Sequence, residues 1–212
     1  MRFITNLLPL LRISNASAPH FSRSLTILGA GDEGALNLND LELKHNYSVR
    51  KSAAHSITMT DFMVEELADR EPGTSFIHSF PGSVKTGITR DMPLWARIPA
   101  NVLMVLMKPF LVGLEETGQR QLFNLTSGLF PPGNAFDGAP FAAGVSVPSG
   151  TSVAKGSNGT VGSGAYLVNW NNEVTGKERL LKEYRETGAA RIVWEHTMGI
   201  FDRVENINQK RA

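Results

Sequence analysis

The feature that most constrains the fold is a long helical pattern that leads, through a tight turn, into a short apolar strand. Apolar side chains recur at helical spacing from Ala53 to Leu67, and Glu71-Pro72-Gly73 ends the pattern. Residues 75–78 then form an apolar run of strand length. A helix followed at once by such a strand indicates an α/β protein with a mainly parallel sheet.

Two further segments extend this pattern. Residues 24–28 are apolar and β-branched, and residues 164–168 have a similar composition near the C-terminus. We therefore predict three mainly parallel strands near residues 24–28, 75–79 and 165–169, with helices on both faces. The 212 residues fit a single domain, and the Gly-, Ser- and Pro-rich stretch at about 131–163 is predicted to be a loop-rich insert. A charged helix is expected at residues 177–186, with Gly188 as its C-terminal cap.

Tyr47 and Lys51 are the side chains best suited to proton transfer. A phenol has a pKa of about 10, so it needs a group that stabilises the phenolate, and an ammonium four residues away on one helix face does so. The same spacing also fits a solvated helix face, so both interpretations stay open here. The turn from Pro81 to Thr86 offers backbone donors and a hydroxyl at a strand end, where ligands bind in open α/β sheets.

A glycine motif follows the first predicted strand. Gly29, Gly31 and Gly34 spell G-x-G-x-x-G. A dinucleotide fingerprint should open a helix and be followed by an acid about twenty residues later. Instead, residues 35–40 are Asn-rich, and Arg50 and Lys51 stand where the acid belongs. We interpret the motif as a coincidence rather than a cofactor site.

Several motifs in order carry a resemblance to a known family. They are Tyr47-x-x-x-Lys51 with Ser52-Ala53-Ala54 behind it, Pro81-Gly82-x-Val84-x-Thr86 after the next strand, Gly164-Ala165-Tyr166-Leu167-Val168, and a closing helix from Gly188 to Phe201. In this order the chain resembles the second half of a short-chain dehydrogenase/reductase, most of all the fungal members with long loops. The resemblance implies the C-terminal part of a Rossmann-like, doubly wound parallel sheet.

The resemblance also implies a site. Tyr47 would be the general acid/base, and Lys51 would lower its pKa and hold the ribose of NADP or NAD. The residues expected to bind the cofactor are Tyr47, Lys51, Pro81, Gly82, Val84 and Thr86. The substrate would be a small molecule with a carbonyl or secondary alcohol.

The chain departs from the family pattern in two places. The family serine that hydrogen-bonds the substrate carbonyl is expected where Gly29 and Ala30 stand, so a donor from elsewhere, or a backbone N–H of the glycine turn, would have to replace it. The glycine-rich βα unit that holds the pyrophosphate is not found before Phe3, so we expect a chain that lacks the N-terminal dinucleotide-binding half. Such a chain should expose a sheet edge that an oligomer or a partner covers.

Composition bounds the other functions. A net charge of +1 gives no electrostatic case for nucleic acid or for an anionic membrane, and the chain has no cysteine. His55 and His78 have no second ligand at metal spacing, so we expect no metal site and interpret both as structural. No run is long enough to span a membrane.

The N-terminal segment allows three interpretations. Residues 1–24 are basic and free of acids, as in a mitochondrial presequence. Arg2, an apolar stretch and Ala16-Ser17-Ala18 can also be interpreted as a secretory signal. The third interpretation is an amphipathic helix kinked by Pro9. We expect a cytoplasmic protein, with the mitochondrion as the alternative.

Residues 87–114 are apolar and rich in methionine. By resemblance they form helices that cover a bulky apolar substrate, as in fungal secondary metabolism; an ordinary pair of core helices is the alternative. Two hypotheses on function result. The first is an NAD(P)-dependent oxidoreductase of the short-chain dehydrogenase type. The second is a truncated, non-redox derivative that binds a partner, or catalyses without a cofactor, in the substrate pocket.

Overall fold

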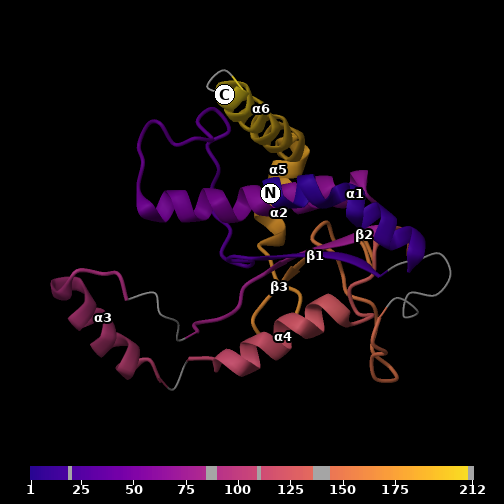
Figure 1. Ribbon diagram of the computed structural model, residues 1–212, viewed down its shortest axis with the longest axis horizontal. Coiled ribbons are helices and arrows are strands. Elements are labelled where there is room, and N and C mark those ends of the chain that lie inside the picture. The colour runs from indigo at the N-terminus through magenta and orange to yellow at the C-terminus, as the bar shows by residue number, and fades with distance from the viewer. Residues whose placement is uncertain (19–20, 85–89, 109–110, 136–143, 210–212) are drawn as a thin grey trace.

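The computed structural model describes residues 1–18, 21–84, 90–108, 111–135 and 144–209. Helices and strands follow one another along the chain as shown in Figure 1. In chain order, the elements are α1 Arg2–Ser17, β1 Ser22–Ile27, α2 Val49–Arg70, β2 Thr74–Ser79, α3 Leu94–Leu106, α4 Leu114–Thr126, the 3-10 turn η3 Gly133–Ala135, β3 Ala165–Val168, α5 Glu178–Glu186 and α6 Ala189–Gln209.

The three strands form one parallel sheet in the order β1-β2-β3. Ser24 of β1 pairs with Phe76 of β2, and Phe76 in turn pairs with Ala165 of β3. Each crossover contains a helix, as parallel pairing requires. The predicted strands, and the α/β class with them, are therefore confirmed, with boundaries shifted by one or two residues.

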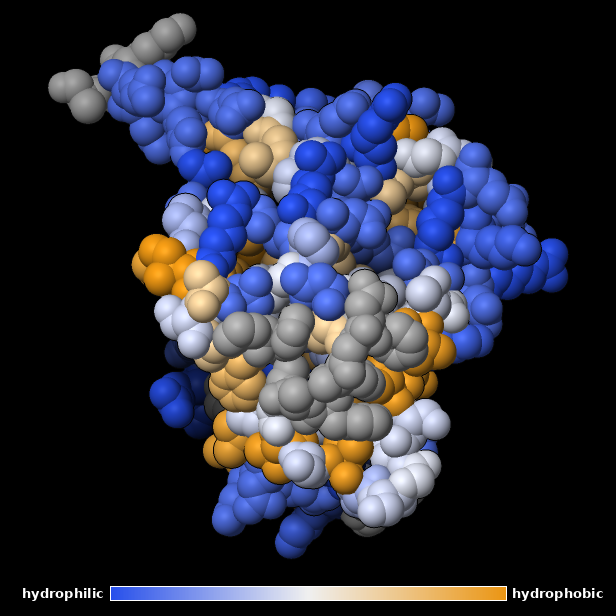
Figure 2. Space-filling model, turned by 90° about the vertical axis from the view of Figure 1, so that its right-hand side faces the viewer, coloured by the Kyte–Doolittle hydropathy of each residue, from blue (hydrophilic) through white to orange (hydrophobic). Residues whose placement is uncertain are grey.

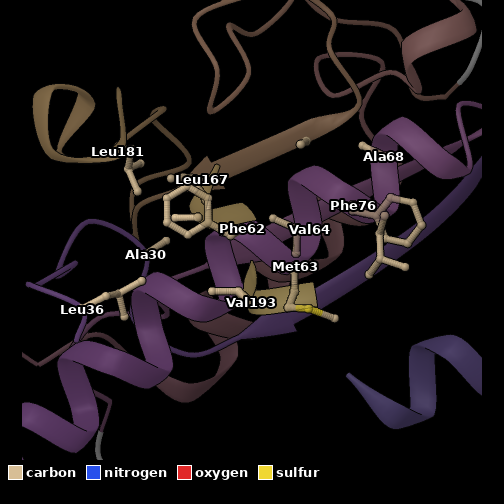
Figure 3. Packing of buried hydrophobic residues seen from close by; sticks show 13 residues of the cluster. Ala30, Leu36, Phe62, Met63, Val64, Ala68, Phe76, Leu167, Leu181 and Val193 are labelled. Atoms are coloured by element: carbon tan, nitrogen blue, oxygen red, sulfur yellow. The ribbon is translucent and has the colours of Figure 1, made fainter. Parts of the chain in front are cut away.

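Successive residues of the central strands face opposite sides of the sheet, as the two-residue period of a strand requires. On one side, Phe76 and Leu167 pack against α2, α6 and the turn after β1 (Figure 3). On the other side, Ile77 and Tyr166 pack against Phe130, just after α4. Figure 1 shows the corresponding layers, with α1, α2 and α6 above the sheet and α4 below it. Helices thus cover both faces, as predicted.

Helix α2 supplies the centre of the larger cluster. Its residues Phe62, Met63, Val64 and Leu67 are at most 1% exposed, which makes this helix the main packing surface of the sheet. Burying four such side chains stabilises the fold by roughly 1.5–3 kcal/mol each. The predicted helix is therefore a core element from its middle to its end, whereas its first turn is exposed.

The remaining segments follow most of the predictions. α1 contains Pro9 and has no buried residue, so it packs only with partly buried side chains. α5 coincides with the predicted charged helix, and Gly188, with φ of 72°, separates it from α6. The described part of the insert after η3, residues 144–163, contains isolated bridges such as Lys155 to Val161 and no helix or strand.

The core-helix interpretation of residues 87–114 is not supported. α3 has no buried residue, and α4 begins at Leu114. In Figure 1, α3 lies at the lower left, at the periphery of the molecule.

Candidate functional site

The start of α2 places Lys51 but not Tyr47 on the helix. Ser48 is the N-cap, because its Oγ accepts the backbone N–H of Lys51 at 3.2 Å. Tyr47 therefore precedes the helix, and the expectation that Tyr47 and Lys51 share a helix face is wrong. The physical reason is that a serine cap needs extended backbone, here φ −150° and ψ 153°, which turns the chain away before residue 48.

A tight loop leads into this cap. The two carboxylate oxygens of Asp40 accept the backbone N–H groups of His45 and Lys44, each at 2.8 Å. The hydrogen bond from His45 is the main reason why the pKa of Asp40 lies below its ordinary value. Asn46 has a positive φ of 57°, and its carbonyl accepts a hydrogen bond from Lys51 Nζ at 3.2 Å. The lysine head is thereby held beside the backbone that carries Tyr47.

Lys51 lines a cavity of about 580 Å³ between the start of α2 and the chain that leaves the glycine turn. The lining residues are Gly34, Ala35, Leu36, Asn37, Leu43, His45, Asn46, Ser48, Arg50, Lys51, Ala54 and His55. This lining contains two permanent cations and no carboxylate, and its walls are otherwise apolar or neutral. It can therefore hold a small organic molecule and favours one with acceptor or anionic groups.

The turn after β2 lines a different cavity. Gly82, Phe80 and Trp170 line a space of about 390 Å³, and no residue lines both this cavity and the one at Lys51. Gly82 has φ of 81°, and a Cβ there would lie 3.0 Å from Trp170 Cβ, so the close turn requires glycine. Val84 forms a bridge with Val112, and Pro81 is partly buried.

The structure thus separates the predicted site residues into two groups. Lys51 belongs to the first cavity, and Gly82 to the second. Tyr47 is 65% exposed and lines neither. Thr86, the last residue of the predicted set, lies outside the described residues.

Backbone donors of the glycine turn after β1 are already bound by a side chain of the same turn, Glu33. The side chain of Glu33 is buried, and its Oε1 and Oε2 accept the backbone N–H groups of Gly31 at 2.7 Å and Lys177 at 3.0 Å. Lys177 Nζ also donates to the Glu33 carbonyl. The N–H groups that a pyrophosphate would need here are therefore occupied from within the chain.

Two more backbone donors of this turn are also bound. The N–H of Gly29 donates to His78 Nε2 at 3.1 Å, and that of Gly34 donates to Thr58 Oγ1 at 2.9 Å. No helix follows the turn until Val49. The motif does not have the form of a dinucleotide fingerprint, and the suggestion that its backbone N–H groups replace the missing serine finds no support at Gly29, Gly31 or Gly34.

Packing explains why glycine stands at these positions. A Cβ at Gly34 would lie 2.5 Å from Ala54 Cβ, and one at Gly29 would lie 2.7 Å from Ile57 Cδ1. Gly31 has φ of 98° and faces Thr175. Gly29 and Gly34 thus let the turn approach α2 closely. A serine at position 29 would have to displace the end of the Ile57 side chain.

Below the turn lies a buried pair, His78 of β2 and Asp61 of α2. Both side chains are inaccessible to solvent, and His78 Nδ1 lies 2.6 Å from Asp61 Oδ1. Burial lowers the pKa of His78 to about 4. Burial, followed by the nearby carboxylates of Glu33 and Glu65, raises the pKa of Asp61 well above its ordinary value. The pair is therefore held in its neutral form, and the interpretation of His78 as structural agrees with this geometry.

Sequence reasoning missed three groups of this region: the Ser48 cap, the buried Asp61 and the buried Glu33. Ser48 carried a usable signal, because a serine directly before a helical pattern is a typical N-cap. Asp61 and Glu33 carried none, because single acids in a helix or a turn are usually exposed.

His55 lines the cavity and accepts the Asn37 N–H at 3.1 Å, and burial lowers its pKa.

Neither a metal site nor a membrane-spanning helix is found in the part of the chain that the structure describes. No group of three or more His, Asp or Glu side chains in these ranges is arranged to hold a metal ion. Within the same ranges, the helices are too short or too polar to cross a bilayer.

The chain is similar to fungal proteins that are named oxidoreductases. The chain is 44% identical over 207 residues to Oxidoreductase AN1596 of Emericella nidulans, a match that covers 96% of this chain and 59% of that protein. It is 34% identical over 204 residues to Oxidoreductase andH of Emericella variicolor, covering 96% and 58%. It is 29% identical over 220 residues to Short-chain dehydrogenase/reductase SAT2 of Stachybotrys chartarum, covering 98% and 57%.

The chain thus spans less than three fifths of the length of these relatives. No protein-family model and no solved structure matches it.

Proposed function

We propose that the chain is the substrate-binding part of an NAD(P)-dependent oxidoreductase of the short-chain dehydrogenase/reductase type. Its substrate would be a bulky, largely apolar small molecule with a carbonyl or secondary alcohol, as in fungal secondary metabolism. The observation that carries the proposal is the cavity of about 580 Å³ at Lys51, which lies between the exit of a parallel strand and the start of α2. The lineage of the relatives supports it.

The residues fit a nicotinamide cofactor in part. Lys51 and the Ser48 cap offer donors that suit ribose hydroxyls, and Gly82 and Val84 form the turn proposed to contact the nicotinamide end. The glycine turn does not fit a pyrophosphate, because the N–H groups of Gly29, Gly31 and Gly34 are bound within the chain. In a complete site, the pyrophosphate would need donors other than these three N–H groups.

In the proposed reduction, Tyr47 Oη donates its proton to the carbonyl oxygen while a hydride adds to the carbonyl carbon. The bound reduced nicotinamide would supply that hydride. Lys51, whose Nζ is held at the Asn46 carbonyl, would stabilise the phenolate that Tyr47 leaves, and a proton from solvent restores the phenol. For this step Tyr47 must turn from its exposed position towards the cavity.

A test follows from the position of Lys51. Reduction of bulky ketones should be followed by NAD(P)H absorbance, with Lys51→Met compared with Lys44→Met. Lys44 lies in the same loop but pairs with Glu42 and does not line the cavity. Loss of turnover in Lys51→Met alone would support the proposal, whereas equal rates in both variants would contradict it.

A second function, non-redox binding or catalysis in the same cavity, is favoured by the filled glycine turn. Here a substrate would bind without cofactor, and calorimetry would show tight ligand binding that NAD(P)H neither strengthens nor weakens.

A further inference from the structure

Helix α3 presents a wide apolar face to solvent. None of its 13 residues is buried. Trp95, Ile98, Val102 and Leu106, spaced three or four residues apart, are 80%, 60%, 56% and 70% exposed. At about 100° per residue these four side chains lie on one side of the helix. Solitary exposed apolar residues are ordinary, but a continuous apolar stripe marks an interaction surface.

α3 carries a narrow polar stripe beside its apolar face. Arg97 and Asn101 lie one turn apart on this stripe, while the exposed Leu103 and Val105 extend the apolar surface around the rest of the helix. Lys108 follows the helix end, and residues 92–108 contain no Asp or Glu. Arg97 and Lys108 have no acidic partner among the described residues. The segment is therefore cationic as well as apolar, which favours a partner that offers negative charge next to hydrocarbon.

Length excludes a membrane span and suits the interface. Thirteen residues extend about 20 Å, whereas the hydrocarbon core of a bilayer is about 30 Å thick. A largely apolar helix that includes tryptophan and has a narrow basic stripe suits the headgroup region. Trp95 is at the N-terminal end and Lys108 just after the C-terminal end, so both ends have groups that favour the interface.

We propose that α3 is a membrane-interface helix that docks the protein on anionic lipid. The apolar stripe from Trp95 to Leu106 would enter the boundary between headgroups and acyl chains. Arg97 and Lys108 would remain among the lipid phosphates and carboxylates. A lipid surface would deliver apolar molecules close to the chain, but the proposal does not depend on the oxidoreductase function.

The probe is a set of vesicles of phosphatidylcholine, with or without about one third phosphatidylserine, mixed with the complete 212-residue chain. Binding is measured by co-sedimentation, and insertion by the blue shift of tryptophan emission relative to Trp95→Phe. We expect binding to the anionic vesicles that weakens severalfold between low and high salt. Arg97→Gln should weaken it about fivefold on anionic vesicles and leave neutral vesicles unaffected.

One double variant and one single control separate the helix from non-specific hydrophobic binding. Trp95→Glu with Val102→Glu should lower vesicle binding at least tenfold. Leu122→Glu, on α4, removes an equally exposed apolar side chain and should leave binding unchanged. Circular dichroism checks that each variant is folded. Absence of binding to anionic vesicles, or equal binding by the double variant, would overturn the proposal. The proposal would also be overturned if the wild-type chain formed a dimer without lipid and the double variant were a monomer, because α3 would then bind a second copy of the chain.

Discussion

His78 donates a hydrogen bond from Nδ1 to Oδ1 of Asp61 across 2.6 Å, in a site closed to solvent. The direction follows from the other ring nitrogen, because Nε2 accepts the N–H of Gly29 and must be unprotonated. The imidazole is therefore neutral, and it links β2, α2 and the glycine turn. This link joins the strand end to the helix that carries Lys51.

The pair predicts an unusual pH dependence of stability. Unfolded His78 takes up a proton below about pH 6.5, but folded His78 does so only near pH 4, so its contribution to stability falls as pH drops between those values. Asp61 acts in the opposite sense, because its raised pKa keeps a proton that the unfolded chain loses above about pH 3.9. The two slopes offset each other where they overlap.

Asp61→Asn should reveal the pH dependence of the unfolding free energy that His78 contributes. The amide keeps an acceptor for Nδ1 and cannot titrate. Between pH 6.5 and 4, the free energy of unfolding measured with denaturant should therefore fall more steeply than in wild type, by up to about 1.4 kcal/mol per pH unit. An identical profile in Asp61→Asn and wild type would show that Asp61 does not hold a proton in the fold.

Gly31→Ala should destabilise the fold by about 2 kcal/mol. The residue has φ of 98°, which costs an alanine about 1–2 kcal/mol, and the new Cβ would meet Thr175 Oγ1 at 2.7 Å. Gly118→Ala in α4 is the matched control: nothing lies within 4 Å of its Cβ, so stability should rise by up to about 1 kcal/mol. Urea unfolding of both variants measures the difference, and equal midpoints would refute the packing role of Gly31.

Tyr47→Phe should lower turnover by about 100-fold or more and leave the affinity for cofactor nearly unchanged. In the proposed mechanism the phenol would act in proton transfer, whereas the ring that remains would keep its contacts. Steady-state rates and a separate cofactor titration measure the two effects. An active phenylalanine variant would show that Tyr47 is a surface residue and no more.

NAD(P)H should bind this chain only in the millimolar range, about −4 kcal/mol. The described residues offer Lys51 to the ribose, but the glycine turn offers its N–H groups to Glu33 and His78 instead of to a pyrophosphate. A fluorescence or calorimetric titration measures the constant. Micromolar affinity would mean that the pyrophosphate has another site in the chain.

The outer edge of β1 should promote association of the isolated chain. β1 pairs only with β2 among the described residues, and Ile27 at its end is 52% exposed. The face in Figure 2 also gathers hydrophobic residues in its lower half, at the height of α4 in Figure 1. Light scattering after gel filtration should show oligomers that Thr26→Lys reduces. A stable monomer at micromolar concentration would contradict this expectation.

Sequence patterns predicted the sheet well because its inner strands are buried, and burial leaves an apolar signature such as that of β3, Ala165–Val168. They failed at Tyr47 because a cap is decided by one hydrogen bond, Ser48 Oγ to Lys51 N–H, and a four-residue spacing cannot show on which side of the cap a residue lies. The buried Asp61 and Glu33 were missed because their partners, His78 and Lys177, are 17 and 144 residues away. Only the folded topology brings such groups together.

The side chain of Glu33 also limits how the glycine turn could acquire nucleotide binding through mutation. A turn whose N–H groups are bound by a side chain of the chain itself cannot take up a nucleotide phosphate by a gradual gain of affinity, because the glutamate must leave before the phosphate enters. Its departure would leave the backbone N–H groups of Gly31 and Lys177 without their acceptors, so the intermediate would be less stable than either end point. The N–H groups of Gly31 and Lys177 can therefore either hold Glu33 and stabilise the fold, or bind a nucleotide phosphate, but not both at once.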